Sequence, residues 1–262
     1  MNKVCLITGG TSGIGLCTAE AMTKGGYVVY EISRRKEGND IVNHFQGDIT
    51  DEKTLEPIIN AIIEKEGHID ILINNAGFGI SGAVEFTDTQ DAIRQFDVNF
   101  FGMVRMNKLI LPIMRKQGYG RIINLSSVAG AIPIPFQTYY SASKAAINSY
   151  TMALANEVKP FSISVCCIQP GDIKTGFTDA RKKSEKGDDI YRGKISKSVA
   201  GMERDERSGM KPQTAGEFIY KVATKRCVKP IYTIGAMYKT FCFLAKILPH
   251  RVVNFIVRQL YA

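Results

Sequence analysis

Short apolar runs of strand length alternate along this chain with amphipathic segments of helical length. Strands are expected at residues 3–8, 27–32, 41–46, 69–73, 121–125 and 163–168, and helices at 13–24, 54–66, within 89–117 and at 139–158. The run at 69–73 is continuously apolar, as expected of a strand covered on both faces. Strands alternating with helices at this spacing indicate a parallel sheet with helices on both sides. We therefore predict one α/β domain over residues 1–262, built on a doubly wound parallel sheet.

Two segments depart from this alternation. Residues 172–210 are polar, dense in charges of both signs and poor in apolar periodicity. A long irregular insert in a compact fold is usually functional, and this one directly follows a strand, so we predict a substrate lid. Residues 218–262 form a C-terminal extension in which apolar residues recur at helical spacing. They are Val253, Ile256, Val257 and Leu260, with Phe241, Leu244 and Leu248 as a second set.

The positive charge of the chain is concentrated in this extension. The net charge is +9, and residues 218–262 contain eight Lys or Arg and no Asp or Glu. An anionic ligand, an anionic membrane surface or an ordinary solvated surface would each explain this composition. A basic amphipathic helix can lie on anionic lipid. The interpretation favoured here is a helix packed on the domain with its charges in solvent.

Composition otherwise indicates a soluble globule. The chain of 262 residues is 45% apolar and 23% charged, which is ordinary for a protein with a sizeable core. Its first apolar stretch, residues 4–7, is too short for a signal peptide, and no apolar run reaches the length of a membrane span. We therefore predict a cytoplasmic protein. The six cysteines show no paired metal-ligand spacing, so we expect reduced thiols and no metal site.

A glycine-rich turn follows the first predicted strand. Residues 8–15 read Thr-Gly-Gly-Thr-Ser-Gly-Ile-Gly and open the first predicted helix. Glycines let the backbone turn tightly and approach a pyrophosphate, and the helix N-terminus offers free N–H groups and a positive dipole end. Any strand-to-helix turn can use glycine for its backbone angles alone. The position of this turn and the residues downstream favour a dinucleotide site.

The end of the second strand indicates which dinucleotide the site prefers. The chain there reads Glu31-Ile32-Ser33-Arg34-Arg35. A carboxylate at the last strand position accepts hydrogen bonds from the ribose 2′-hydroxyl of NAD, whereas Arg pairs with the 2′-phosphate of NADP. No acid stands at that position, and guanidinium groups suit phosphate. This pattern favours NADP(H), with solvated loop charges as the alternative explanation of Arg34 and Arg35.

A tyrosine and a lysine lie one helical turn apart in the helix predicted at 139–158. Tyr140 and Lys144 share a helix face, whereas the neighbouring Tyr139 points elsewhere. A free phenol has a pKa of about 10. A nearby ammonium would lower the pKa of Tyr140 by roughly two to three units, into the range useful for proton transfer. Beside a dinucleotide, this pair predicts a hydride-transfer enzyme; the alternative is a buried Tyr and Lys that only satisfy hydrogen bonds in a core.

Over residues 3–175 the chain resembles the short-chain dehydrogenase/reductase family. The glycine turn, Asp48, the run Asn74-Asn75-Ala76-Gly77, and Asn99, Ser127, Tyr140, Lys144, Pro170-Gly171 and Thr175 carry the resemblance. The chain length and the extension are similar to the group of 17β-hydroxysteroid and retinol dehydrogenases. The resemblance implies a Rossmann-type fold and reversible hydride transfer between a nicotinamide and a carbon that bears oxygen.

The resemblance also implies a role for individual residues. Tyr140 would be the acid/base, Lys144 would support it and reach the ribose, and Ser127 would hold the substrate oxygen. Asn99 would hold a water in a proton relay behind Lys144. Ser126 is the alternative to Ser127, because successive strand residues face opposite ways and only the family spacing favours Ser127. Together with the end of the second strand, the expected cofactor-binding residues are Gly9, Thr11, Ser12, Gly13, Ile14, Gly15, Ser33, Arg34, Arg35, Asp48, Ile49, Asn75, Ala76, Gly77, Tyr140, Lys144, Pro170, Gly171, Ile173 and Thr175.

The side chains expected around the substrate are apolar or aromatic, and they favour a bulky apolar alcohol or ketone over a sugar. They are Phe78, Ile80, residues 128–136 and Phe177. The resemblance suggests hydroxysteroids, bile acids or retinoids, and the basic extension would suit an anionic member such as a bile acid. A 3-ketoacyl thioester reductase is the alternative enzyme. A non-catalytic NADP-sensing or scaffold protein is the alternative of another class, which the full set of Asn99, Ser127, Tyr140 and Lys144 disfavours.

Expected partners are few. Positive charge lies at one end of the chain and no nucleic-acid-binding module is visible, so nucleic-acid binding is not expected. The family usually pairs through its two long helices, here near residues 100–117 and 140–158, which predicts a homodimer or homotetramer. Peripheral membrane contact through the extension is an alternative to the packed helix.

Overall fold

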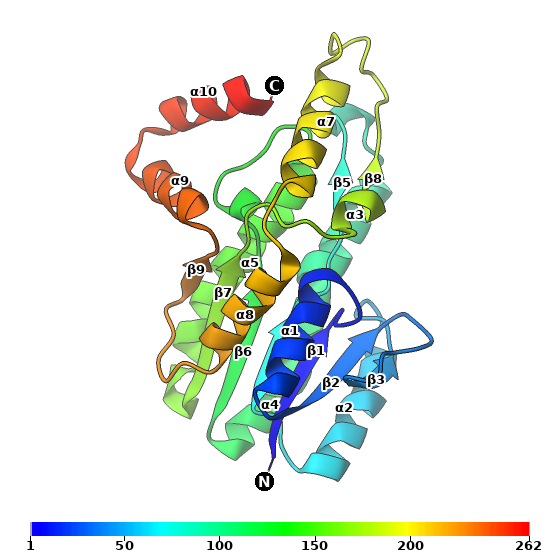
Figure 1. Cartoon of the computed structure of the whole chain (residues 1–262), viewed down its shortest axis with the longest axis vertical. Helices are drawn as coiled ribbons and strands as arrows, with labels where there is room; N and C mark the ends of the chain where they lie inside the picture. Colours follow the sequence, from blue (N-terminus) through cyan, green and yellow to red (C-terminus); the bar gives the residue numbers. More distant parts are fainter. Residues whose placement is uncertain (1, 262) are drawn as a thin grey trace.

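A seven-stranded parallel sheet forms the centre of the computed structural model, which describes residues 2–261 (Figure 1). The strand order β3-β2-β1-β4-β6-β7-β9 runs outward in both directions from β1 and β4. This doubly wound order confirms the predicted Rossmann-type fold, and it places the crevice for a ligand at the carboxyl ends of the strands. The strands are β1 Lys3–Thr8, β2 Tyr27–Ser33, β3 Asn43–Gln46, β4 Ile71–Asn74, β6 Gly120–Leu125, β7 Ile163–Gln169 and β9 Ile231–Thr233.

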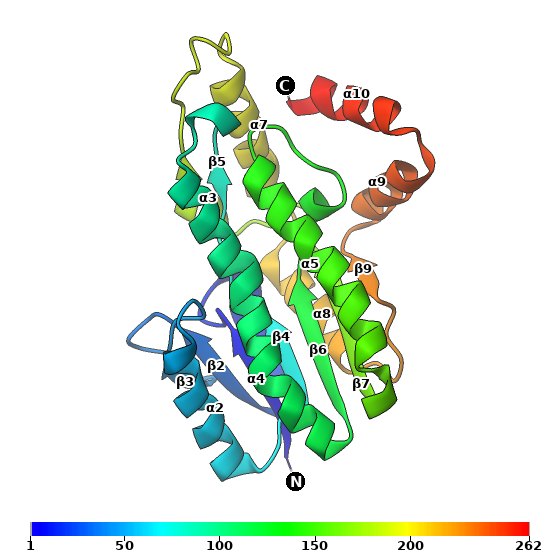
Figure 2. The same cartoon turned by 180° about the vertical axis from the view of Figure 1, so that it is seen from behind.

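Both faces of the sheet are buried because successive side chains of a strand point to opposite sides. Val4 and Leu6 of β1 belong to one core cluster, and Cys5 and Ile7 belong to another. Figure 1 shows α1 and α8 over one face, and Figure 2 shows α4 and α5 over the other. The covering helices are α1 Gly13–Lys24, α2 Glu52–Glu66, α4 Gly102–Gln117, α5 Thr138–Glu157 and α8 Pro212–Ala223.

The long helix expected within 89–117 has an irregular centre. It consists of α3 (Thr89–Phe96), a π-helical segment (Asp97–Phe101) and α4. The candidate residue Asn99 lies in the π segment. Wider π turns change which backbone groups are paired and are frequent at functional sites. Short 3₁₀ turns occur at Val84–Phe86, Val128–Gly130 and Lys159–Phe161.

The insert at 172–210 is more regular than its sequence suggested. It contains α6 (Phe177–Ala180), β8 (Lys182–Lys183) and α7 (Lys194–Arg207), and β8 pairs with β5 (Ile80–Ser81). The prediction of an irregular segment was wrong. Ile195, Val199 and Met202 recur at helical spacing and are buried together, but the surrounding charges obscured this narrow apolar stripe.

The C-terminal extension continues the sheet before it becomes helical. The short edge strand β9 was not predicted, whereas α9 (Ala236–Ile247) and α10 (His250–Tyr261) coincide with the expected apolar spacing. The favoured interpretation was a helix packed on the domain with its charges in solvent, and the charges are exposed, but only part of the apolar residues pack inward. Only Cys242 of α9 and Val257 of α10 are buried, and Phe241, Leu244, Ile256 and Leu260 are exposed. Within residues 2–261, no helix has the length and apolarity required to cross a bilayer.

Candidate active site

A cavity of about 1000 Å³ opens along the carboxyl ends of the sheet strands. Segments that follow β1, β2, β3, β4, β6 and β7 all contribute to its wall. Every residue expected to bind the cofactor lines this cavity, as do Ser127, Tyr140 and Lys144. Asn99 does not line it and lies behind the wall. The structure therefore brings residues from six separate parts of the sequence into one cavity.

The glycine turn provides a cradle that only glycine allows. Gly9 and Gly13 have φ of +68° and +54°, a backbone region that favours glycine. A Cβ added to Gly15 would lie 2.1 Å from the carbonyl oxygen of Gly9, well inside van der Waals contact. The turn then enters α1, whose first N–H groups have no intrahelical partner. These features fit the pyrophosphate of a dinucleotide, and Gly9, Thr11, Ser12, Gly13, Ile14 and Gly15 would hold it.

Thr8 and Asn75 lock this turn to the neighbouring strand. The Asn75 amide donates to the carbonyl oxygens of Thr8 and Gly9, each at 3.0 Å. The backbone N–H groups of Asn75 and Ala76 both donate to the Thr8 hydroxyl at 3.1 Å. These bonds fix the end of β4 beside the end of β1. The role of Thr8 was not predicted, because a threonine at a strand end is uninformative without its partners.

The acidic residue of β2, Glu31, points into the protein and is already hydrogen-bonded there. The Glu31 carboxylate is fully buried, accepts the Gly10 N–H at 3.0 Å and lies 2.5 Å from Nδ1 of His44. It therefore does not face the ribose position. Arg34 and Arg35 line the cavity with Ser33, and the Arg35 guanidinium lies 3.4 Å from the carbonyl oxygen of Thr11. Two cations thus flank the adenosine end of the cavity.

Asp48 and Ile49 form the floor at the same end. The Asp48 carboxylate accepts hydrogen bonds from the N–H and hydroxyl of Thr50, at 2.9 Å and 2.8 Å. Ile49 is buried, and a Cβ added to Gly102 would meet its side chain at 2.6 Å. Gly102, the first residue of α4, thus allows the helix to approach this loop closely. The position of both residues fits the expected contact with an adenine.

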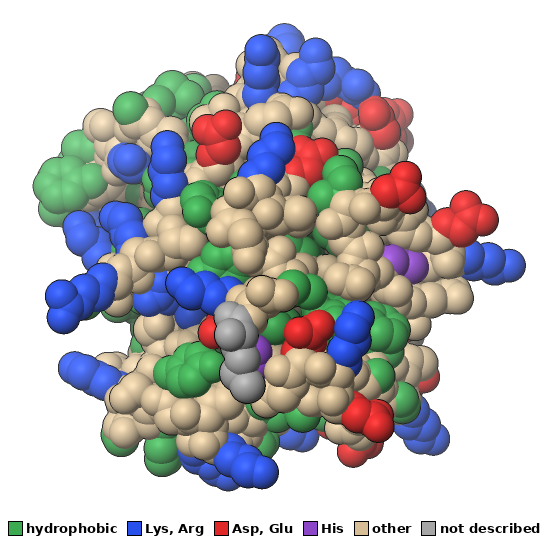
Figure 3. Space-filling model, turned by 60° about the horizontal axis from the view of Figure 1, so that its bottom comes forward, with side chains coloured by type: hydrophobic (Ala, Val, Ile, Leu, Met, Phe, Trp, Pro, Cys, Tyr) green, Lys and Arg blue, Asp and Glu red, His purple; other side chains and the backbone are tan. Residues whose placement is uncertain are grey.

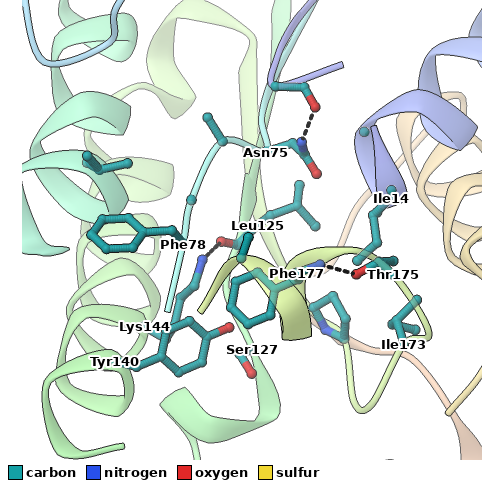
Figure 4. Close-up of a pocket in the computed structure, with 18 of the residues that line it drawn as sticks. Ile14, Asn75, Phe78, Leu125, Ser127, Tyr140, Lys144, Ile173, Thr175 and Phe177 are labelled. Carbon is teal, nitrogen blue, oxygen red and sulfur yellow. Dashed lines mark hydrogen bonds between the residues drawn. The ribbon is translucent and has the colours of Figure 1, made fainter. Parts of the chain in front are cut away.

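Tyr140, Lys144 and Ser127 converge deeper in the cavity (Figure 4). The Lys144 ammonium donates to the Leu125 carbonyl oxygen at 2.8 Å and lies 5.7 Å from the centre of the Tyr140 ring. Ser127 lies beside Tyr140 in the cavity wall, whereas the Ser126 hydroxyl donates to the Lys144 carbonyl oxygen at 2.9 Å. Tyr139 does not line the cavity. The geometry therefore favours Tyr140 and Ser127 over their neighbours.

The pKa of Tyr140 moves in the direction opposite to the one expected. Burial raises it to about 12, and the neighbouring Ser127 side chain opposes this only in part. Burial also lowers the pKa of Lys144 to about 8. Desolvation of the phenol explains the error, since burial disfavours the charged phenolate more than its neighbours stabilise it. At neutral pH the phenol therefore keeps its proton and can donate it.

Asn99 shapes the wall behind Lys144. Its side-chain amide donates to the Phe78 carbonyl oxygen and accepts the Phe78 N–H, both at 3.0 Å. A Cβ added to Gly77 would lie 3.1 Å from Asn99 Oδ1 and 3.6 Å from Lys144 Nζ. Asn99 thus clamps the segment after β4 while the π segment places it beside Lys144. Its expected role in holding a water stays a prediction.

Residues after β7 close the deep end of the cavity. The Val128 N–H donates to the Pro170 carbonyl oxygen at 3.0 Å, which joins this segment to the one bearing Ser127. The Thr175 side chain would contact a Cβ on Gly13 at 3.4 Å. Phe177 follows, and its ring lies 5.7 Å from that of Tyr140. Pro170, Gly171, Ile173 and Thr175 are therefore placed where a nicotinamide would contact Tyr140.

The outer wall contains residues that the sequence did not single out. Asp172 lines the cavity, and its carboxylate accepts a hydrogen bond from the Tyr238 hydroxyl at 2.5 Å. Burial raises the pKa of Asp172. Asp205 and Glu206 of α7 also line the wall, as do Tyr238 of α9 and the penultimate residue, Tyr261.

The expected substrate wall is confirmed only in part. Phe78, Val128, Ala129, Ile134 and Phe177 line the cavity. Ile80 does not, because it is buried in β5.

Among residues 2–261, no group of three or more His, Cys, Asp or Glu side chains could hold a metal ion.

Comparison with known proteins decides the family. The family model described as short chain dehydrogenase matches residues 3–186. The chain belongs to the short-chain dehydrogenase family. The 3-ketodihydrosphingosine reductase of Bacteroides thetaiotaomicron is 39% identical over 264 residues, which cover 99% of this chain and 98% of that one.

Solved structures agree with this membership. A short-chain dehydrogenase from Streptomyces avermitilis superimposes with a TM-score of 0.83 at 30% identity, covering 93% of this chain and 91% of that one. The structure of ElxO with NADP bound gives a TM-score of 0.76 at 28% identity, covering 92% and 100%. This short-chain dehydrogenase is thus an oxidoreductase acting between an alcohol and a carbonyl group. A nicotinamide cofactor held in this cavity would supply or accept the hydride. Ser127 and Tyr140 line the same cavity, and their expected roles, holding the substrate oxygen and exchanging its proton, stay predictions.

Proposed function

We propose that the protein is an NADPH-dependent reductase of a long-chain amino ketone of the 3-ketosphingoid type. The carboxylates beside the catalytic phenol are the observation that carries this proposal. Asp172 and Glu206 lie close enough to Tyr140 to raise its pKa electrostatically, and Asp205 lines the same wall. A ketone that carries an ammonium group next to its carbonyl would place the ammonium near these carboxylates. 3-Ketodihydrosphingosine, named in the similar Bacteroides enzyme, has that arrangement.

Asp172 is the carboxylate best placed to accept the ammonium. Glu206 is already paired with the buried Arg181 and accepts a hydrogen bond from the Thr178 hydroxyl at 2.7 Å. Asp172 has the neutral Tyr238 hydroxyl as its partner. The same negative charge disfavours bile acids and other anionic substrates, despite the basic extension. Apolar side chains of the remaining wall would hold the hydrocarbon chain.

A protonated Tyr140 suits the reductive direction of the reaction. With its pKa raised to about 12, the phenol is a proton donor at neutral pH. A proton donor is needed when a ketone becomes an alkoxide, so the site is prepared for reduction. Residues 172–210 act as a lid in this proposal, since Phe177, Ala180, Met202 and Glu206 form part of the wall.

Replacing Asp172 by Asn should lower kcat/KM for a long-chain 2-amino-3-ketone roughly ten-fold, because an amide cannot pair with an ammonium. The matching ketone without the amine should be turned over as before. Steady-state NADPH oxidation with both ketones measures the ratio. Asp179→Asn serves as the control, since Asp179 is exposed and pairs with Arg207 outside the cavity. An equal loss for both ketones would show a structural role for Asp172 and refute amine recognition.

The preference for NADP(H) rests on Arg34 and Arg35. Both side chains are exposed, so solvent weakens their pairing with a 2′-phosphate. Replacing both by Ala should raise the KM for NADPH roughly ten-fold and leave the KM for NADH unchanged. The two cofactors are compared with one ketone substrate. If both KM values rise together, the two arginines do not recognise the 2′-phosphate.

Ketosteroids, retinal and acetoacetyl thioesters are the comparison substrates for the same assay. Turnover of ketosteroids in preference to the amino ketone would support the hydroxysteroid hypothesis. Preference for the thioester would support a 3-ketoacyl reductase. Cofactor binding without turnover of any of these ketones would favour the non-catalytic alternative.

A further inference from the structure

Helix α9 presents apolar side chains outward as well as inward. Its inner side holds Tyr238 and Cys242 against the domain. Its outer side carries Met237, Phe243 and Ile247, which are 55%, 62% and 60% exposed. Phe241 and Leu244 are exposed as well. A helix that only covers a core would be polar on the outside.

Helix α10 has the same arrangement. Val257 and Tyr261 lie inward, one turn apart. The outer side carries Phe255 and Leu260, which are 54% and 64% exposed, with Val252 and Ile256 beside them. The two helices therefore expose nine large apolar side chains. They are Met237, Phe241, Phe243, Leu244, Ile247, Val252, Phe255, Ile256 and Leu260.

These helices lie together at one side of the molecule. Figures 1 and 2 show α9 and α10 projecting from the end of β9 past the body of the sheet. In Figure 3 apolar side chains gather at the left edge, the side that both helices occupy in Figure 1. A concentration of exposed apolar residues of this kind marks an interaction surface.

The charges carried by the two helices themselves have one sign. Lys239 and Lys246 lie on α9, and Arg251 and Arg258 lie on α10. All four are exposed, and residues 218–262 contain no acid. A second copy related by two-fold symmetry would bring the same basic patch against itself. A surface with anionic headgroups above an apolar layer would satisfy both the cations and the apolar side chains.

We infer that α9 and α10 form an interfacial anchor that lies on an anionic phospholipid membrane. The inner sides of the same helices contribute Tyr238 and Tyr261 to the wall of the catalytic cavity. The anchor thus sits between the lipid and the cavity. Transfer of a long-chain substrate by this route rests on the proposed function, whereas membrane binding does not depend on it.

Vesicle flotation tests the anchor directly. The full-length protein should float with vesicles of phosphatidylcholine and phosphatidylglycerol, and bind vesicles of pure phosphatidylcholine more weakly. Replacing Phe243 and Phe255 together by Ser should abolish flotation with both. Ile190→Ser is the matched control, because Ile190 is 65% exposed but lies in the insert. Turnover of a short water-soluble ketone should be unchanged in the double variant.

The charges should account for the lipid preference. Replacing Arg251 and Arg258 by Gln should weaken binding to the anionic vesicles roughly thirty-fold, or about five-fold for each cation. Lys53→Gln with Lys116→Gln, two exposed lysines elsewhere, should have no such effect. Added salt should reproduce the loss in the unchanged protein.

Light scattering tests whether the two helices bind a second copy of the chain instead of a membrane. Loss of vesicle binding in the Phe243 and Phe255 variant at unchanged oligomeric mass supports the anchor. Absence of binding to anionic vesicles by the full-length protein overturns it. So does a variant that changes the oligomeric mass and leaves flotation intact, because the helices would then bind a second copy. Because flotation needs no substrate, failure of the anchor is separate from failure of the proposed reaction.

Discussion

Replacing Tyr140 by Phe is expected to lower kcat for ketone reduction about a hundred- to ten-thousand-fold, the contribution typical of a positioned general acid. The phenol keeps its proton at neutral pH because burial raises its pKa to about 12. Without that hydroxyl the developing alkoxide loses its positioned proton donor. The affinity for NADPH should remain, since the aromatic ring and Lys144 are still present. Stopped-flow NADPH oxidation and a fluorescence titration of NADPH measure the two quantities.

Tyr139→Phe is the matched control for this variant. It removes a phenolic hydroxyl from the adjacent residue, which does not line the cavity, and should leave kcat unchanged. If Tyr140→Phe retained kcat within the range of the control, another group would have to supply the proton. If it lost NADPH binding in parallel, its defect would be structural.

Gly15→Val is expected to weaken NADPH binding by up to roughly a hundred-fold and to destabilise the fold by about 1–3 kcal/mol. The added Cβ would lie 2.1 Å from the Gly9 carbonyl oxygen and 2.5 Å from the Asn75 amide nitrogen. One contact is with backbone, and the other is with the side chain that locks the turn. The turn must therefore open, which displaces the N–H groups of the pyrophosphate site. Isothermal titration with NADPH and thermal unfolding measure the two effects.

Gly201→Ala distinguishes a local effect from a general intolerance of substitutions at glycine. Gly201 lies in α7, where an added Cβ approaches no atom closer than 3.8 Å. Alanine is also the better helix former, so this variant should be as stable as the unchanged protein or more so. Normal NADPH affinity in Gly15→Val would mean that the pyrophosphate does not occupy the glycine turn.

Much of the fold could be predicted because the apolar runs seen in the sequence are the same segments that the folded sheet buries. The apolar strands of β1, β4 and β7 are covered on both faces, so their runs stand out in the sequence. Predicted element ends differ from the observed ends by one or two residues in most cases. The edge strand β9 has three residues and only partly buried side chains. A strand this short has no recognisable pattern of its own.

The site was predictable where spacing within one element determined it. Tyr140 and Lys144 share a helix, and the glycine turn is one continuous segment. The outer wall was not predictable, because Asp172 meets Tyr238 across 66 residues of sequence. The π segment around Asn99 also leaves no clear mark, since its residues continue an ordinary helical pattern. The expected direction of the Tyr140 pKa shift was wrong for a related reason. That pKa depends on burial, which cannot be read from the spacing of residues in the sequence.

The exposed apolar sides of α9 and α10 show a different limit of prediction from sequence. Helical spacing correctly indicated helices, but spacing alone does not say what covers an apolar side. Val257 packs inward, and its neighbour Ile256 faces outward. Only the structure separates the side that completes the cavity from the side that is free to contact lipid.

We propose above all that this short-chain dehydrogenase reduces a long-chain amino ketone with NADPH. The most direct measurement is NADPH oxidation with a long-chain 2-amino-3-ketone, followed by mass spectrometry of the product. We expect one equivalent of the amino alcohol for each NADPH consumed, and slower turnover when the amine is acetylated. Saturable NADPH binding with no alcohol formed, or faster turnover of the acetylated ketone, would contradict it.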